Sequence, residues 1–243
     1  MSGSGAAGVA EAQRAVARAE EMGSLGEIAM TNFFLSMAFN FAGEWHSAIE
    51  AGRKAVEVGE ASKERIYVCL GLAWKGWAEA RAGDFKAAKT SMARAQIVLD
   101  ELGGKIIAAD WIAAINAEVA FSQGRIEEAI RLAQRAIATA QKMGGKGAEG
   151  LARRIQGQAL ATLALPRWVE AEEQLKKSLR LLDSGQNRVE AAYTQLAWGR
   201  LCLDQGNPVA ARAHWEQAAV QWETSGLTHE LERTRSLIDD LDA

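Results

Sequence analysis

A repeat of about forty residues, with one turn signal per unit, constrains the fold of this chain more than any other feature. The turn signals are spaced by 40, 41, 42 and 40 residues and stand at Gly43, Gly83, Gly124, Pro166 and Gly206. A second sign of duplication is the segment AQRAVARAEEMG at residues 12–23, which returns as AQRAIATAQKMG at residues 133–144. Self-similarity at a fixed period of this length is the signature of repeat architectures, in which each unit packs mainly on its neighbours.

Small residues keep a fixed register within these units. Five residues after the turn signals stand Ala48, Ala88, Ala129, Ala171 and Ala211. Twelve residues after them stand Ala55, Ala95, Ala136, Ser178 and Ala218, and seven residues before them stand Ser36, Gly76, Ala117, Ala159 and Gly199. Alanine fills about a fifth of the chain, so five alanines share one repeat position by chance roughly 3 times in 10,000. Antiparallel helices approach closely only where their contact line carries small side chains. We therefore interpret these positions as the seams of helix pairs.

The apolar spacing after each turn predicts a helix. Within residues 126–143 apolar side chains recur every three or four positions, and glutamates in the first turn match the helix dipole. Gly144 then stops the helix, and the preceding helix is expected from about Ile106 to Ser122. We therefore predict an all-α chain of antiparallel helix pairs, forming a single solenoid over residues 7–243. Its expected parts are a linker or tag remnant at residues 1–6, a half repeat at 7–23, five pairs turning at residues 43, 83, 124, 166 and 206, and an amphipathic capping helix at 228–241.

The half repeat at the start has further implications. Because the array begins inside a repeat, we expect the chain to be part of a longer protein. We also expect the half repeat to expose an apolar face that carries Val9 and Val16. Exposed apolar faces commonly bind another protein surface, so the half repeat favours self-association.

The small, aromatic and alanine residues around the turns resemble the tetratricopeptide repeat, most clearly in Gly83-Asp84-Phe85 followed by Ala88 and Ala95. The resemblance covers about residues 7–226, and the long period is similar to that of the MalT-like group. It implies a right-handed superhelix that serves as a sensor or scaffold in a larger regulatory protein. Such a module would bind a protein, a peptide or a small anionic effector on its concave face. A structural spacer or oligomerisation arm without a small ligand is the alternative.

In tetratricopeptide arrays the first helix of each unit lines the concave surface. Carried over to this sequence, the resemblance implies a binding face that mixes aromatic rings with arginines. The predicted binding residues are Phe33, Met37, Asn40, Trp77, Arg81, Trp111, Glu118, Arg153, Gln156, Tyr193 and Arg200. Aromatic rings supply rigid contact area, and arginine forks bind carboxylates or phosphates. The alternative is that the aromatic rings pack between units while the arginines only solvate the face.

Composition and motifs argue against several other classes of protein. The net charge of −3 gives no electrostatic drive towards nucleic acid or an anionic membrane, and no run of 18 apolar residues is present. Two distant cysteines are not a disulfide framework, which fits a cytoplasmic protein. The three histidines lack the spacing of metal ligands, and neither a phosphate loop nor a nucleophile elbow occurs. We therefore expect no metal, no cofactor and no enzymatic activity.

Overall fold

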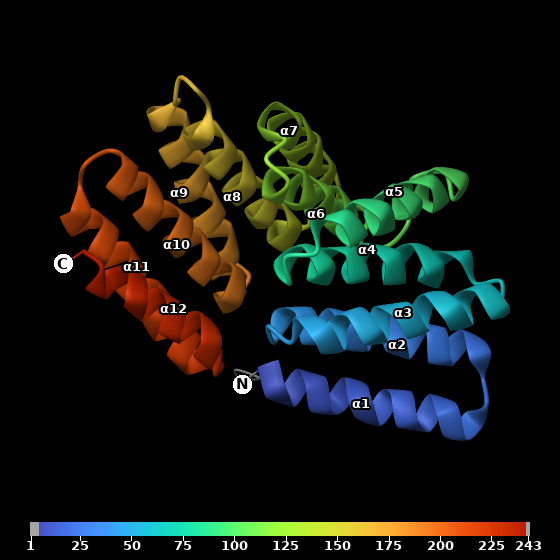
Figure 1. Ribbon diagram of the computed structural model, residues 1–243. Helices are drawn as coiled ribbons and strands as arrows, with labels where there is room; N and C mark the ends of the chain where they lie inside the picture. Colours follow the sequence, from blue (N-terminus) through green and yellow to red (C-terminus); the bar gives the residue numbers. More distant parts are fainter. Residues whose placement is uncertain (1–4, 242–243) are drawn as a thin grey trace. The chain divides into compact units, whose positions relative to one another are not determined.

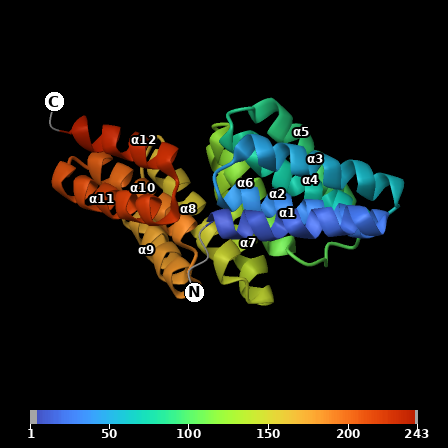
Figure 2. The same cartoon turned by 90° about the horizontal axis from the view of Figure 1, so that it is seen from below.

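The computed structural model describes residues 5–241, and within them every regular element is an α-helix (Figure 1; Figure 2 gives the view from below). The helices are α1 (Gly5–Met22), α2 (Leu25–Phe41), α3 (Trp45–Ala61), α4 (Arg65–Arg81), α5 (Phe85–Glu101), α6 (Ala109–Ser122), α7 (Ile126–Met143), α8 (Lys146–Thr162), α9 (Trp168–Ser184), α10 (Arg188–Asp204), α11 (Pro208–Ser225) and α12 (Thr228–Asp239). The chain is therefore an all-α solenoid of helix pairs, as predicted. Among the described residues, no helix has the length and apolarity needed to cross a membrane.

The chain divides into two compact units, residues 1–123 and residues 124–243. Unit 1 contains α1–α6, and unit 2 contains α7–α12. In unit 1 the first helices α2 and α4 pack on their pair partners α3 and α5, and α4 also packs on α2 and on α6. In unit 2 the first helices α8 and α10 pack on each other and on their pair partners α9 and α11. The first helices therefore form a layer of their own within each unit. A single continuous array over residues 7–243 stays a prediction.

The ends of the helices follow from backbone conformation. Gly83 and Gly144 adopt φ of 88° and 75°, a left-handed conformation that glycine enters without a steric penalty and that ends a helix. At the start of the chain, residues 1–4 of the expected linker lie outside the described residues, and residues 5 and 6 belong to α1. The expected start of α6 near Ile106 is wrong, because Ala108 is left-handed with φ of 62° and the helix begins at the next residue.

The alanine register marks the closest helix contacts, as interpreted from the sequence. The five residues that follow the turns by five positions, and the five that follow by twelve, are all 0% exposed. Ser36 of α2 donates its hydroxyl to the carbonyl oxygen of Ala48 in α3 at 2.8 Å. Ser178 of α9 likewise donates to the carbonyl oxygen of Gly150 in α8 at 2.7 Å. Side chains this small let the two helices of a pair come so close that a serine hydroxyl of one reaches a backbone carbonyl of the other.

The expectation that α1 exposes Val9 and Val16 is wrong. Val9 is 7% exposed and belongs to a cluster with Leu35 and Phe39 of α2, against which Val16 is also packed. The apolar stripe of α1 is covered because α2 lies directly on it. The motive for self-association that rested on these two valines is therefore removed.

Candidate functional site

The first helices of unit 1 pack together five aromatic side chains, called here the aromatic cluster: Phe33, Phe41, Trp74, Trp77 and Trp111. The ring of Phe41 meets those of Trp74, Trp77 and Trp111 edge-on, at centroid distances of 5.6, 5.8 and 5.5 Å. This is the preferred arrangement of packed aromatic rings. Phe33 is 4% exposed and Trp77 is 0% exposed. These two predicted site residues therefore pack between repeats, whereas Trp111 remains half-buried.

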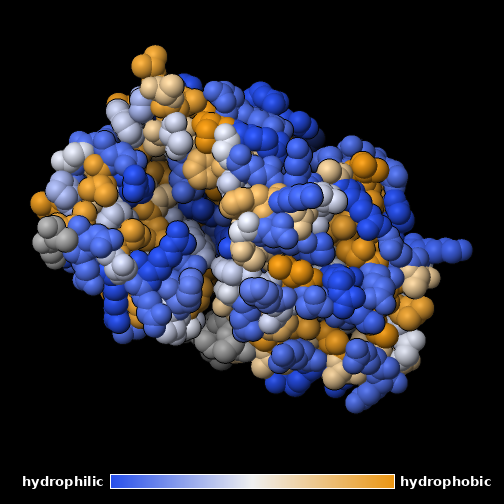
Figure 3. All heavy atoms as spheres, in the orientation of Figure 1, coloured by the Kyte–Doolittle hydropathy of each residue, from blue (hydrophilic) through white to orange (hydrophobic). Residues whose placement is uncertain are grey.

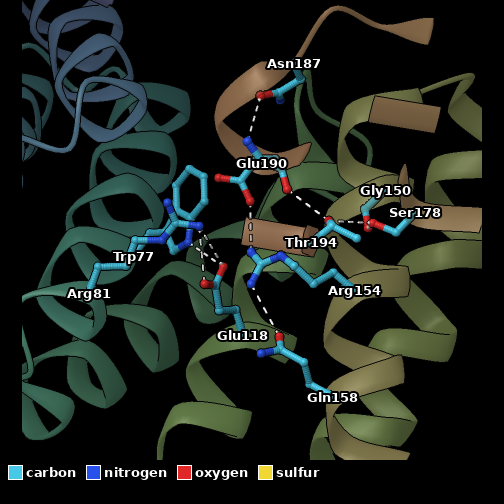
Figure 4. Close-up of polar contacts among 10 residues, drawn as sticks. All are labelled: Trp77, Arg81, Glu118, Gly150, Arg154, Gln158, Ser178, Asn187, Glu190 and Thr194. Atoms are coloured by element: carbon cyan, nitrogen blue, oxygen red, sulfur yellow. Dashed lines mark hydrogen bonds and ion pairs between the residues drawn. The ribbon is translucent and has the colours of Figure 1, made fainter. Parts of the chain in front are cut away.

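Arg81 and Glu118 connect α4 to α6 beside the aromatic cluster (Figure 4). One guanidinium nitrogen of Arg81 lies 3.3 Å from both carboxylate oxygens of Glu118, and Nε1 of Trp77 donates to the same carboxylate at 2.7 Å. The guanidinium also stacks over the rings of Trp77 and Trp45, at 4.1 and 5.4 Å from their centroids. The two charged side chains are 8% and 13% exposed. The structure thus brings these predicted residues together, with their charges directed at each other.

Asn40 and Met37 have different surroundings although both lie on α2. Asn40 is fully buried and donates its amide to the carbonyl oxygens of Ser36 and Trp74, at 2.9 and 3.1 Å. It therefore fastens α2 to α4. Met37 is only half-buried and is thus accessible from outside.

Three of the predicted binding residues of unit 2 contact neighbouring side chains of the same unit. Arg153 donates to Glu149 and to Gln174, at 2.8 Å each. Gln156 is 9% exposed. Tyr193 contacts Trp222 edge-on at 4.8 Å. Arg200 is exposed and pairs with Asp204 within α10.

A buried ion pair in unit 2 is not predicted from the sequence. Arg154 of α8 donates to Glu190 of α10 at 2.8 Å, and the two side chains are 5% and 0% exposed (Figure 4). The guanidinium also lies 5.5 Å from the ring centroid of Tyr193. Arg154 and Glu190 are 36 residues apart, and Arg81 and Glu118 are 37 apart. An arginine followed one repeat later by a glutamate on the next first helix is the sequence signal that could have revealed this pair.

An apolar stripe on α2, called here the α2 stripe, remains accessible: Met30, Phe34, Met37 and Phe41. Its members are spaced by four, three and four residues and so share one helix face. Phe34 is 42% exposed and the other three are half-buried. Figure 3 shows hydrophobic side chains reaching the surface of unit 1 between hydrophilic ones. The sequence analysis predicted Met37 as a binding residue but missed Met30 and Phe34, although their spacing on a nearly uncharged helix is visible in the sequence.

Forty residues after the members of the α2 stripe, α4 carries Leu70, Trp74, Trp77 and Arg81. Leu70, Trp74 and Trp77 are 0%, 1% and 0% exposed. Both tryptophans pack against Phe41 of α2 and against Trp111 of α6, so the two neighbouring first helices bury them together. Of the α2 stripe, Phe41 packs on aromatic rings of α4 and α6, whereas Met30, Phe34 and Met37 stay partly exposed.

Two hollows lie on unit 1. One, of about 300 Å³, is lined by α3, α4 and α5 and contains Arg53, Lys75 and Arg94. Each of these three cations forms an ion pair, Lys75 with Glu79 and Arg94 with Glu60 among them. The other hollow, of about 320 Å³, lies between α1 and α2.

The cysteines and His214 are shifted towards their neutral forms. Burial raises the pKa of the Cys69 thiol to about 12, and its sulfur donates to the carbonyl oxygen of Ala95. Burial also raises the pKa of Cys202, which lies on α10. Both cysteines are free and buried. Burial lowers the pKa of His214, whose ring stacks on Trp198 with centroids 4.6 Å apart.

Comparisons with known proteins identify the fold. No protein-family model matches the chain, and no curated protein matches it. Among solved structures, BtubC (BKLC) from P. vanneervenii is similar with a TM-score of 0.63 at 15% sequence identity, over 90% of this chain and 91% of that chain. At this level of identity the likeness concerns the fold alone. Together with the repeat register, it shows that the chain is a helical-repeat protein.

Proposed function

We propose that this chain is a protein-interaction module of the tetratricopeptide-like kind, of the MalT-like long-repeat group, within a larger regulatory protein. The observation that carries the proposal is the accessible α2 stripe. Contiguous apolar side chains left at the surface of a protein commonly mark an interaction site. Methionine and phenylalanine are well suited to such a site, because methionine adapts its shape and aromatic rings supply contact area. The proposed role is binding, without catalysis.

The helical spacing of the α2 stripe indicates the kind of partner it fits. Methionines and phenylalanines on one helix face form a ridge, against which a second helix packs with apolar side chains spaced by three and four residues. On α4 the counterpart residues Trp74 and Trp77 pack against aromatic side chains of the neighbouring helices α2 and α6. The proposed ligand is therefore a peptide segment that forms an amphipathic helix. A small anionic effector at Arg81 is disfavoured, because this arginine already pairs with Glu118.

The experiment pans the chain against a phage-displayed library of random peptides. The test variant carries Phe34→Ser and Met37→Ser, which replace accessible side chains. The matched control carries Val169→Ser and Val209→Ser in unit 2, where the two valines are 83% and 79% exposed. We expect the unmodified chain and the control to enrich the same amphipathic peptides. The test variant is expected to bind them at least about tenfold more weakly, since apolar anchors carry most of an interface's free energy.

Circular dichroism checks that both variants keep their helices. A folded test variant that binds the enriched peptides as tightly as the unmodified chain would exclude the α2 stripe as the binding surface. The alternative function, a spacer or oligomerisation arm, predicts that no peptide is enriched on any of the three proteins.

A further inference from the structure

One face of α1, called here the open face, is solvent-exposed at positions where the corresponding residues of α7 are buried. By the offset of 121 residues in the duplicated segment, Gly8 and Ala15 correspond to Ala129 and Ala136 of α7. Both alanines of α7 are 0% exposed, whereas Gly8 and Ala15 are exposed. A Cβ built on Gly8 would meet no atom within 4 Å. The small residues on which a pair partner would pack are therefore present on α1, and no helix of the described residues lies on them.

This open face borders the 320 Å³ hollow between α1 and α2. The hollow is lined by Glu11, Arg14, Ala15, Arg18, Ala19 and Met22 of α1 and by Glu27, Met30 and Thr31 of α2. Met22 is 64% exposed. In the complete pairs α2–α3, α4–α5, α8–α9 and α10–α11, the corresponding face holds an antiparallel helix with a small residue at the crossing. The small residues of the open face therefore suit an antiparallel helix that carries a small residue at its centre, and the charged side chains of the hollow require that helix to carry complementary charges.

The charged side chains on the open face indicate which helix binds there. Glu11, Ala15 and Arg18 succeed one another at intervals of four and three residues, so they lie along one side of α1. Read in the reverse direction, the same side presents arginine, alanine and glutamate. When two α1 helices cross antiparallel at Ala15, Glu11 of each lies opposite Arg18 of the other. Arg18 forms no ion pair among the described residues, and Glu11 pairs within α1 with Arg14.

We infer that the open face of α1 binds a second copy of this chain. The two α1 helices pack antiparallel about a two-fold axis, with Ala15 at the crossing and two reciprocal pairs between Glu11 and Arg18. An interface that uses the same patch on both copies closes on itself and stops at a dimer. A contact centred on one helix pair is at the small end of protein interfaces, so the dimer is weak and depends on concentration. This inference goes beyond the proposed function, because it concerns α1 and names its partner.

Sedimentation velocity over a concentration series tests the inference through charge reversal. Arg18→Glu places four carboxylates at the interface, and Glu11→Arg places four guanidinium groups there. Each single variant is expected to raise the dissociation constant of the dimer at least about tenfold, because like charges across an interface repel. The double variant Glu11→Arg with Arg18→Glu restores complementarity and is expected to dimerise as the unmodified chain does. An equimolar mixture of the two single variants is expected to form a heterodimer.

The control is Lys86→Glu, an exposed charge reversal on α5 of the same unit, which is expected to leave self-association unchanged. A chain that stays monomeric at its highest soluble concentration overturns the inference, and so does a dimer that both single variants leave intact. The outcome is separable from that of the proposed function. A monomer that still captures peptides on the α2 stripe keeps the proposed function and loses the dimer. A charge-sensitive dimer that captures no peptide does the reverse.

Discussion

At the scale of single residues, glycines of this chain differ in what a side chain would meet. A Cβ on Gly199 of α10 would lie 2.3 Å from Nε1 of Trp215 and 3.0 Å from the carbonyl oxygen of Ala211. Trp215 is 2% exposed and donates its indole N–H to the carbonyl oxygen of Leu196, so its ring is fixed. A Cβ on Gly8 of α1 would meet no atom within 4 Å. The same substitution therefore has opposite consequences at the two positions.

We predict that Gly199→Ala destabilises the protein by about 1–3 kcal/mol, the usual cost of overpacking a close contact. Alanine is the better helix former by about 1 kcal/mol, so Gly8→Ala is expected to stabilise α1 by up to that amount. Urea unfolding followed by circular dichroism measures both effects. If Gly199→Ala leaves the free energy of unfolding unchanged, the contact between α10 and α11 is looser than described.

At the scale of elements, the start of a helix depends on whether its cap residue accepts a hydrogen bond. Asp84, which precedes α5, accepts a hydrogen bond from the backbone N–H of Ala87 at 2.9 Å. Glu64 holds the same place before α4 without such a bond. Both are acidic, both lie in unit 1, and both are exposed, so they form a matched pair. The difference between them isolates the capping bond from the effect of charge near a helix start.

We predict that Asp84→Ala lowers the free energy of unfolding by about 1 kcal/mol, the typical value of a capping side chain. Glu64→Ala removes a charge without removing a capping hydrogen bond. It is therefore expected to lower the free energy of unfolding by only a few tenths of the loss caused by Asp84→Ala. Thermal or urea unfolding of the two variants provides the comparison. Equal losses would show that charge, and not the hydrogen bond, stabilises the start of α5.

The sequence predicts these elements well where spacing alone decides them. The seams are predictable because a helix pair needs small residues at its crossing, whatever else surrounds it, and Ala48 or Ala211 could be located by counting from a turn. The start of α6 is not predictable in this way, because apolar spacing continues through Ile106 and Ile107 while the left-handed backbone of Ala108 interrupts the helix. Periodicity reports which face is apolar, but it does not report a local break in the backbone.

At the scale of the whole molecule, the candidate site is harder to predict because burial depends on neighbours. Met37 and Trp77 occupy the same position of successive repeats, forty residues apart. Trp77 is fully buried against Phe41 of α2 and Trp111 of α6, whereas Met37 stays half-exposed. Register gives both residues the same role, and only the packing of whole helices separates them. The sequence places Arg81 and Glu118 about one repeat apart on successive first helices, but the depth at which they are buried depends in the same way on the neighbouring helices.

The division into two compact units leads to a prediction for local stability. Repeat units contact mainly their neighbours, so a destabilising change is expected to spread over adjacent helices and to fade with distance along the chain. Gly199→Ala is therefore expected to speed amide hydrogen exchange in α10, α11 and their neighbours in unit 2, while residues 5–123 keep their rates. Asp84→Ala is expected to give the reverse pattern, with faster exchange around α5 and unchanged rates in unit 2. Exchange followed by mass spectrometry resolves the individual helices. Uniform acceleration over both units by either variant would show instead that the whole array opens as one cooperative body.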